Sequence, residues 1–223
     1  MSARRGRFIT LEGGEGAGKS TQARLLAQTL EPKGVSVLVT REPGGSPGAE
    51  ALREVILSGA AASFGPTAEA ILFGAARIDH VDNTIEPALA RGAWVISDRF
   101  ADSTRAYQGA AGKVAPALIA SLERVAVGEV RPDLTLILDL PARKGLARAA
   151  ARRGAKGRAD RFEAEEFGFH ETLRQAFLAI GRAEPQRCAI INADRPQQEV
   201  ARAIWACVRE RLGDALPIER EKR

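Results

Sequence analysis

The stretch Gly13-Gly-Glu-Gly-Ala-Gly-Lys-Ser20 decides the fold of this 223-residue chain. It fits the pattern GxxxxGK[ST], follows the apolar run Phe8–Glu12 and precedes a helical pattern at 21–30. Its glycines let backbone N–H groups converge on phosphate oxygens, and the start of the helix adds partial positive charge. A strand, a glycine-rich loop and a helix in this order predict a site for nucleotide phosphates.

We expect this loop to bind ATP. Lys19 is placed to reach the β and γ phosphates, and the Ser20 hydroxyl is placed to bind Mg²⁺. A glycine-rich turn with an incidental lysine is disfavoured, because strand, spacing and helix agree. The motif does not define the reaction, since kinases, GTPases and other ATPases share it. The expected ATP-binding residues are Gly13, Gly14, Glu15, Gly16, Ala17, Gly18, Lys19, Ser20 and Thr21.

Short apolar runs alternate with longer helical patterns along the rest of the chain. This alternation predicts one α/β domain over 1–223, with a five-stranded parallel sheet covered by helices on both faces. In such a sheet, ligands bind beyond the carboxyl ends of the strands. The residues that follow each strand are therefore candidates for the site. The five predicted strands are 8–12, 35–40, 94–98, 134–139 and 188–192.

Composition narrows the classes of partner and compartment. A net charge of +5 favours polyanions, either nucleic acid or nucleotide phosphates. The two cysteines, Cys188 and Cys207, form no CxxC pair, which suits a reducing cytosol. We find no pattern of a signal peptide or of a membrane span. The expectation is a cytoplasmic protein without a membrane partner.

An arginine-rich segment at 143–163 is predicted to form a small lid. Mobile guanidinium groups stabilise the charge of a phosphoryl group in transfer and exclude water. A solvated basic helix or a nucleic-acid patch is the alternative, although the chain is only 5% aromatic, which argues against a groove for single strands. No NKxD segment occurs, which argues against a GTPase. The basic residues are Arg143, Lys144, Arg148, Arg152, Arg153, Lys156, Arg158 and Arg161.

The segment 67–77 is predicted to be a helix with a core-facing apolar stripe. From helical geometry, Phe73 and Arg77 project away from that stripe, four residues apart. A ring beside a guanidinium could stack on a base and donate to its carbonyl oxygen; a helix-helix or dimer contact is the open alternative. The stripe consists of Ala68, Ile71, Leu72, Ala75 and Ala76, extended by Ile78.

Polar residues follow the third predicted strand. Arg99 at the strand end is expected to grip an acceptor phosphate. Ser103, Thr104 and Gln108 supply donors and acceptors for a base edge. Asp98 is expected to organise Mg²⁺ or its waters, although an ion pair of Asp98 with Arg99 is an equal alternative.

Several motifs, in order and spacing, resemble the bacterial thymidylate kinases over nearly the whole chain. The resemblance implies a fold of the nucleoside monophosphate kinase type, a homodimer, and Mg²⁺-dependent formation of dTDP from dTMP and ATP, without a nucleic-acid partner. Besides the phosphate loop, the motifs are Thr40-Arg-Glu-Pro-Gly-Gly45, Phe73 with Arg77, Asp98-Arg-Phe100, Ala106-Tyr-Gln-Gly109 and Asp160-Arg-Phe-Glu163.

The resemblance also implies residue roles for the acceptor. Phe73 would stack on thymine and Arg77 would approach a thymine oxygen, while Thr104 and Gln108 would read the base edge. Tyr107 would crowd the position of a ribose 2′-OH. The implied dTMP-binding residues are Glu42, Pro43, Arg53, Phe73, Arg77, Arg99, Ser103, Thr104, Tyr107 and Gln108.

The implied catalytic residues are Lys19, Arg99, Arg153 as the lid arginine, and Glu15, which would face the deoxyribose 3′-OH. Departures from the family pattern are Phe100 where Tyr or His is frequent, Ser46 in place of Thr, and Arg105 within the Ser-Thr-x-Ala-Tyr stretch. Two rival interpretations stay open. One is a kinase for another nucleoside monophosphate or a deoxynucleoside, and the other is a P-loop regulator that docks on nucleic acid.

Overall fold

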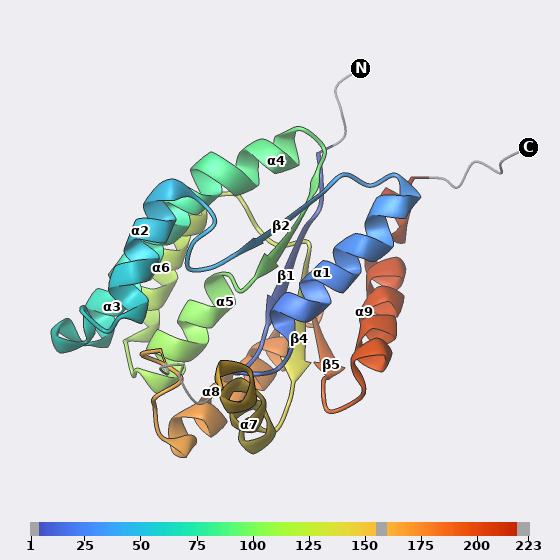
Figure 1. The fold of residues 1–223 in the computed structure, drawn as a ribbon. Coiled ribbons are helices and arrows are strands. Elements are labelled where there is room, and N and C mark those ends of the chain that lie inside the picture. Colours follow the sequence, from blue (N-terminus) through green and yellow to red (C-terminus); the bar gives the residue numbers. More distant parts are fainter. Residues whose placement is uncertain (1–4, 155–159, 218–223) are drawn as a thin grey trace, which may run out of the picture.

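A computed structural model describes residues 5–154 and 160–217, and its centre is a five-stranded sheet (Figure 1). All strand pairs are parallel, in the order β2-β3-β1-β4-β5. This confirms the predicted α/β fold. Every residue of β1 is buried, because the strand lies in the middle of the sheet and is covered on both faces. The strands are β1 Phe8–Glu12, β2 Val37–Arg41, β3 Trp94–Asp98, β4 Leu134–Asp139 and β5 Cys188–Asn192.

One predicted strand needs a correction at its start. β2 begins at Val37 and not at residue 35, and it pairs with β3 from Trp94 onward. The chain before it turns at Gly34, whose φ is 81°, and the N–H of Val35 bonds back to the carbonyl of Leu30. Val35 is therefore held by the end of the preceding helix and is not free to join the sheet.

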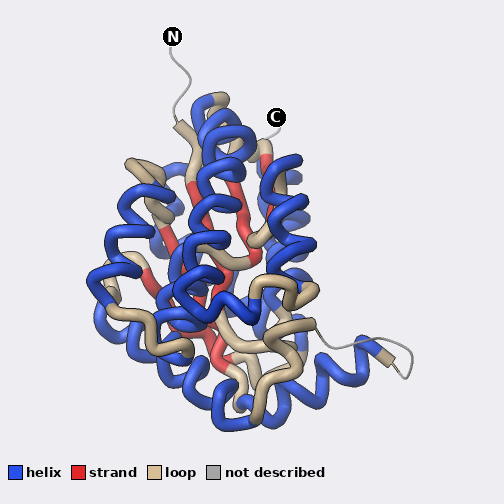
Figure 2. The backbone as a smooth tube through the Cα atoms, turned by 90° about the vertical axis from the view of Figure 1, so that its left-hand side faces the viewer, coloured by secondary structure: helices blue, strands red, loops and turns tan. Residues whose placement is uncertain are grey.

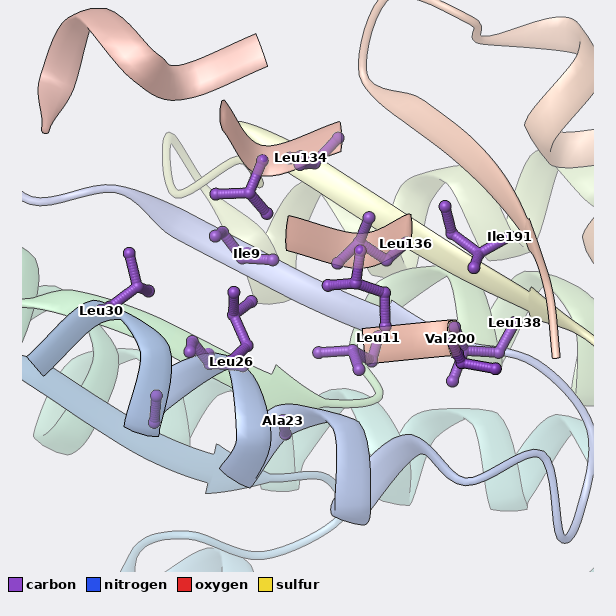
Figure 3. Packing of buried hydrophobic residues seen from close by; sticks show 14 of the residues in the cluster. Ile9, Leu11, Ala23, Leu26, Leu30, Leu134, Leu136, Leu138, Ile191 and Val200 are labelled. Carbon is purple, nitrogen blue, oxygen red and sulfur yellow. The ribbon is translucent and has the colours of Figure 1, made fainter. Parts of the chain in front are cut away.

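Helices cover both faces of the sheet, as Figure 2 shows. On one face, Ile9 and Leu11 of β1 pack with residues of α1 and α9 (Figure 3). On the other face, Ile137 of β4 packs with α8, and Phe8 packs with α4. The helices are α1 Lys19–Leu30, α2 Pro47–Leu57, α3 Gly65–His80, α4 Glu86–Ala90, α5 Ala101–Thr104, α6 Pro116–Val127, α7 Ala142–Arg153, α8 Phe167–Ala183 and α9 Gln197–Leu212.

Shorter helical turns join these elements. Among the described residues, no single helix is both long and apolar enough to cross a membrane; only the bent pair Pro47–Leu57 with Ala62–Ala90 passes such a test, and only when its parts are combined. The short turns are η1 Glu31–Lys33, η2 Ala62–Phe64, η3 Val81–Ile85, η4 Arg105–Ala111 and η5 Gly213–Ala215.

The predicted orientation of the helix at 67–77 is wrong. The helix runs from Gly65 to His80, and three residues of the supposed core stripe lie at the surface: Ala75, Ile71 at 50% exposed and Ile78 at 39% exposed. Arg77 and His80 are buried instead. The inward side of α3 carries polar groups that pair with Glu42 of the loop after β2, so apolar periodicity does not mark the buried face.

The phosphate loop and α7 touch through their backbones. A Cβ added to Gly145 would lie 2.2 Å from the carbonyl oxygen of Glu15, and a Cβ added to Gly16 would lie 2.1 Å from the carbonyl oxygen of Gly145. Side chains have no room at this contact. Glycine at both positions therefore lets the start of the arginine-rich helix rest directly on the loop.

Gly145→Ala should destabilise the protein, because the new methyl group would force the loop and α7 apart. We expect the free energy of unfolding in urea to fall by roughly 1–3 kcal/mol. Gly168→Ala is the matched control, since the Cβ at this helical glycine meets nothing within 4 Å. The control should stay within about 1 kcal/mol of the wild type, on the stabilising side. Equal behaviour of the two variants would contradict the contact.

Candidate active site

The phosphate loop lies at the carboxyl end of β1 and leads into α1, near α7 beyond the strand arrowheads in Figure 1. Gly18 caps the helix with a φ of 94°, a conformation that favours glycine. The Lys19 ammonium is buried and donates to the carbonyls of Gly13 at 3.1 Å and Gly14 at 2.8 Å. Burial, with the nearby charge of Arg99, lowers the pKa of Lys19.

A cavity of about 340 Å³ opens beside this loop. Residues from the loop, from the chain after β2 and β3, from α3 and from the chain after α7 meet around it. These origins are far apart in sequence, and the parallel sheet brings them to one edge. The lining residues are Glu15, Gly16, Gly18, Lys19, Ser20, Thr21, Arg24, Arg41, Glu42, Pro43, Arg53, Leu57, Phe73, Asp98, Arg99, Ser103, Thr104, Tyr107, Gln108, Arg152, Asp160, Phe162 and Glu163.

Most of the residues expected to bind a ligand line this cavity. Among the expected ATP-binding residues, Gly13, Gly14 and Ala17 do not line it; the first two offer carbonyls to Lys19, and Ala17 is buried. Among the expected dTMP-binding residues, only Arg77 lies outside the lining. Arg153 is also absent from it, and its neighbour Arg152 is present.

Arg99 joins the two halves of the cavity. Its Nη1 donates to the carbonyl of Gly13 at 3.1 Å and to Ser103 Oγ at 3.2 Å. Its Nη2 donates to Glu15 Oε1 at 2.6 Å and to the Tyr107 hydroxyl at 2.8 Å. Burial would lower the pKa of Arg99, but Tyr107, Glu15 and other acidic groups outweigh burial and raise it. This guanidinium therefore stays charged at the junction.

The carboxylate of Glu15 is the acidic partner in this group. Tyr107 donates its hydroxyl to Glu15 Oε1 at 2.6 Å. Burial alone would raise the pKa of Glu15, yet the charges of Arg99 and Lys19 and the hydrogen bond from Tyr107 hold it at about 2. Burial and the adjacent Glu15 raise the pKa of Tyr107 well above its ordinary value. At neutral pH the site thus holds an ionised Glu15 beside a neutral phenol.

Arg77 lies behind the cavity wall and is 3% exposed. Its Nε donates to Glu42 Oε2 at 2.8 Å, and its Nη2 donates to Thr104 Oγ1 at 3.1 Å and to the carbonyl of Phe100 at 3.2 Å. His80 Nδ1 lies 3.1 Å from the other oxygen of Glu42. Arg77 therefore fixes Thr104, which does line the cavity, and its own guanidinium is already engaged.

Aromatic rings form one end of the cavity. The ring of Phe73 lies 5.9 Å from that of Phe162, and the ring of Phe162 lies 5.3 Å from that of Tyr107. Arg53, on the neighbouring α2, donates to the carbonyl of Pro43 at 2.5 Å. An apolar surface beside arginines suits a flat base that carries a phosphate.

The last residues of α7 and the chain after it contribute charged groups from the predicted lid. Arg153 Nη1 pairs with Glu163 Oε2 at 2.5 Å, and Arg152 Nη2 pairs with Glu163 Oε1 at 3.3 Å. Lys156 and Arg158 of the predicted lid lie outside the described residues. At the cavity mouth, Ser20 donates its hydroxyl to a carboxylate oxygen of Asp98.

Glu12, the last residue of β1, was not among the predicted site residues. It is 0% exposed and accepts hydrogen bonds from the N–H and hydroxyl of Ser103 and from the N–H of Phe100. Burial, together with the charge of Asp102, raises its pKa to about 7. An acidic residue ending an otherwise apolar strand was the available signal. Arg24 and Leu57 are other cavity residues missed from the sequence, whereas Arg41, Asp160, Phe162 and Glu163 belong to the quoted motifs but had no assigned role.

A profile of the family described as thymidylate kinase matches residues 11–204, a stretch that includes every residue lining the cavity. The chain belongs to the thymidylate kinase family. A thymidylate kinase of Bradyrhizobium sp. (strain ORS 278) is 57% identical over 212 residues, covering 95% of this chain and 93% of that protein. One of Rhodopseudomonas palustris (strain TIE-1) is 59% identical over 209 residues, covering 93% and 90%.

Solved structures agree with this family. The crystal structure of a thymidylate kinase from Ehrlichia chaffeensis matches with a TM-score of 0.72 and 32% identity, and the match covers 92% of this chain and 99% of that one. The likeness to thymidylate kinases thus extends over the sheet, the phosphate loop and the opposite wall of the cavity.

Glu12 should make the stability of the protein depend on pH. Its pKa is about 7 in the folded chain and about 4.3 when unfolded, so the folded state binds the extra proton between these values. The free energy of unfolding should therefore fall as pH rises, by about 2–3 kcal/mol between pH 5 and pH 8. Glu12→Gln should remove this loss. Urea unfolding of both proteins at several pH values measures it, and parallel curves would contradict the assignment.

Proposed function

We propose that this chain binds ATP on its phosphate loop and dTMP on the opposite wall of the same cavity, with the two phosphates meeting at Arg99. Members of the thymidylate kinase family transfer a phosphoryl group from ATP to dTMP, and the chain forms dTDP for dTTP synthesis in this way. The observation that carries the proposal is the single cavity lined by both sets of residues, joined by one guanidinium.

On the donor side, the loop backbone and α1 receive the ATP phosphates. Lys19 exchanges its contacts with the carbonyls of Gly13 and Gly14 for the β and γ phosphates. Arg153 or the adjacent Arg152 supplies the lid guanidinium, since both are held beside the cavity by Glu163. These cations stabilise the negative charge that spreads over the moving phosphoryl group.

On the acceptor side, Arg53 and Arg99 hold the monophosphate. Phe73 forms the stacking surface for thymine, and Thr104 with Gln108 faces the base edge. Arg77 acts on the base mainly by fixing Thr104 in place. The other members of the proposed dTMP set are Glu42, Pro43, Ser103 and Tyr107.

Tyr107 and Glu15 distinguish deoxyribose from ribose in the acceptor. The phenol of Tyr107 is pinned by Glu15 and Arg99, so it occupies space where a ribose 2′-OH would stand. The ionised Glu15 accepts a hydrogen bond from the deoxyribose 3′-OH. Together they favour a deoxyribonucleotide over a ribonucleotide.

Ser20 and Asp98 fit Mg²⁺, because both offer oxygen ligands and they are already joined by a hydrogen bond at the cavity mouth. The described residues include no group of three or more His, Cys, Asp or Glu side chains that could hold a metal ion. The remaining ligands of such an ion are phosphate oxygens and water. When bound, Mg²⁺ neutralises charge on the phosphate oxygens.

The homodimer that the resemblance implies has a suitable surface on α3 and α6. Ile71 and Ile78 of α3 are exposed there, and Val125 of α6 is 71% exposed. A groove of about 560 Å³ runs between Ile78 and Val125. Covering these side chains with a second copy removes apolar surface from water.

We place the enzyme in the cytoplasm, where its nucleotide substrates occur and its two cysteines stay free.

Purified protein should produce ADP from ATP only when both Mg²⁺ and dTMP are present. A coupled assay over dTMP, dUMP, CMP and deoxynucleosides tests this, and dTMP should give the highest kcat/KM. Turnover with another acceptor alone would assign the chain to that substrate. Retention on DNA with steep salt dependence and no turnover would favour a regulator.

Arg53→Ala should raise the KM for dTMP about ten-fold or more, because it removes a charged donor to the acceptor phosphate. The KM for ATP should change less than two-fold. Arg209→Ala, on the exposed side of α9, is the matched control and should behave as the wild type. An unchanged dTMP constant in Arg53→Ala would remove Arg53 from the acceptor site.

The wild-type protein should sediment as a dimer in analytical ultracentrifugation, and Val125→Glu should sediment as a monomer. A charge in a covered apolar surface is costly, whereas the same charge on a free surface is not. Phe167→Glu is the control, since Phe167 is also exposed but lies on α8. A monomeric wild type, or a dimeric Val125→Glu, would show that this surface is not the interface.

A further inference from the structure

Glu12 is a buried carboxyl group beneath the active site that does not itself line the cavity. All three of its hydrogen bonds come from the segment that opens α5: the N–H of Phe100 at 2.8 Å, the N–H of Ser103 at 3.3 Å and the Ser103 hydroxyl at 2.7 Å. Burying a carboxylate is costly, and hydrogen bonds offset only part of that cost. The raised pKa of about 7 reflects the remainder.

The segment that Glu12 contacts needs contacts from other elements to keep its conformation. α5 is the first part of a helical segment that continues without a break into η4. Just before it, Arg99 adopts a φ of 75°, which is unfavourable for a residue other than glycine. External contacts must maintain this turn.

Contacts from two strands clamp α5 from different directions. Glu12 of β1 accepts the N–H groups at its start, as a capping side chain does. Arg187, which precedes β5, donates to both carboxylate oxygens of Asp102 at 2.7 and 2.8 Å. Asp102 thus fixes the helix to the far part of the sheet, and Glu12 fixes it to the strand that leads directly into the phosphate loop.

A directed chain of hydrogen bonds links Glu12 to the acceptor arginine. Arg99 Nη1 donates to Ser103 Oγ, and the same hydroxyl donates to Glu12 Oε2. Because the hydroxyl hydrogen points at Glu12, the oxygen lone pairs of Ser103 are free to accept from Arg99. A carboxylate supports this direction, since it accepts at both oxygens. An amide at this position would instead turn its NH₂ group, a donor, toward either the backbone N–H groups or the Ser103 hydroxyl.

We propose that Glu12 is a positioning residue for phosphoryl transfer: it holds Arg99 and Ser103 at a fixed place relative to the phosphate loop, and so sets the acceptor phosphate in line with ATP. This inference rests on the proposed acceptor role of Arg99. Glu12 does not touch either substrate. It acts through the turn after β3, and it is itself the last residue of β1, the strand that leads into the phosphate loop.

Steady-state kinetics of Glu12→Gln at pH 8, where the wild-type group is ionised, test the proposal. The KM for dTMP should rise about ten-fold and kcat should fall, because one of the hydrogen bonds to a charged group is lost. The KM for ATP should stay within two-fold. Unfolding in urea, measured in parallel, should show the variant at least as stable as the wild type. Glu123→Gln, far from the cavity on α6, is the matched control.

The outcomes separate the alternatives. A dTMP constant within two-fold of the wild type would overturn the positioning role, and an equal rise in both constants would show that Glu12 shapes the phosphate loop. A variant that loses stability and activity together is explained by a merely structural role, which also overturns the proposal. If the wild type itself does not use dTMP, the proposed function fails, and the positioning role of Glu12 fails with it.

Discussion

The guanidinium of Arg99 is the contact on which the site depends. It bonds to the phosphate loop through Gly13 and Glu15, and to the turn after β3 through Ser103 and Tyr107. Two strand ends of a parallel sheet lie side by side in any case; this cation fixes their loops relative to each other. In the proposed function this positive charge stands between two phosphates that repel each other, and it would offset that repulsion.

The cavity wall contains buried polar groups that cost stability but hold the residues of the site in place. Burying ionisable groups is costly, and the wall behind the cavity contains several, among them Glu12, Glu42 and Arg77. Each is satisfied by partners on other elements, so the wall is stiff as well as polar. Stiffness matters for chemistry that consists almost entirely of placement and charge, because small displacements of the reacting groups slow the reaction strongly.

The sheet and the phosphate loop could be predicted from the sequence because both have local signatures, and four strands have the predicted bounds. The buried face of α3 could not be predicted. Its inward side chains Arg77 and His80 are polar and are paired across the fold with Glu42, and such pairing leaves no periodic pattern in one helix. The same limit applies to Glu12, whose partners lie more than eighty residues away. The resemblance to a family supplied most acceptor residues.

Phe162 belongs to two parts of the molecule at once. Its ring closes the aromatic end of the cavity against Phe73 and Tyr107, and the next residue, Glu163, holds Arg152 and Arg153. In the proposed acceptor site, a base too large for the space beside Phe162 would displace the same stretch of backbone that holds Arg152 and Arg153. Selectivity by this route would act on the rate of transfer, because a misfit acceptor that enters the site would move these cations out of alignment.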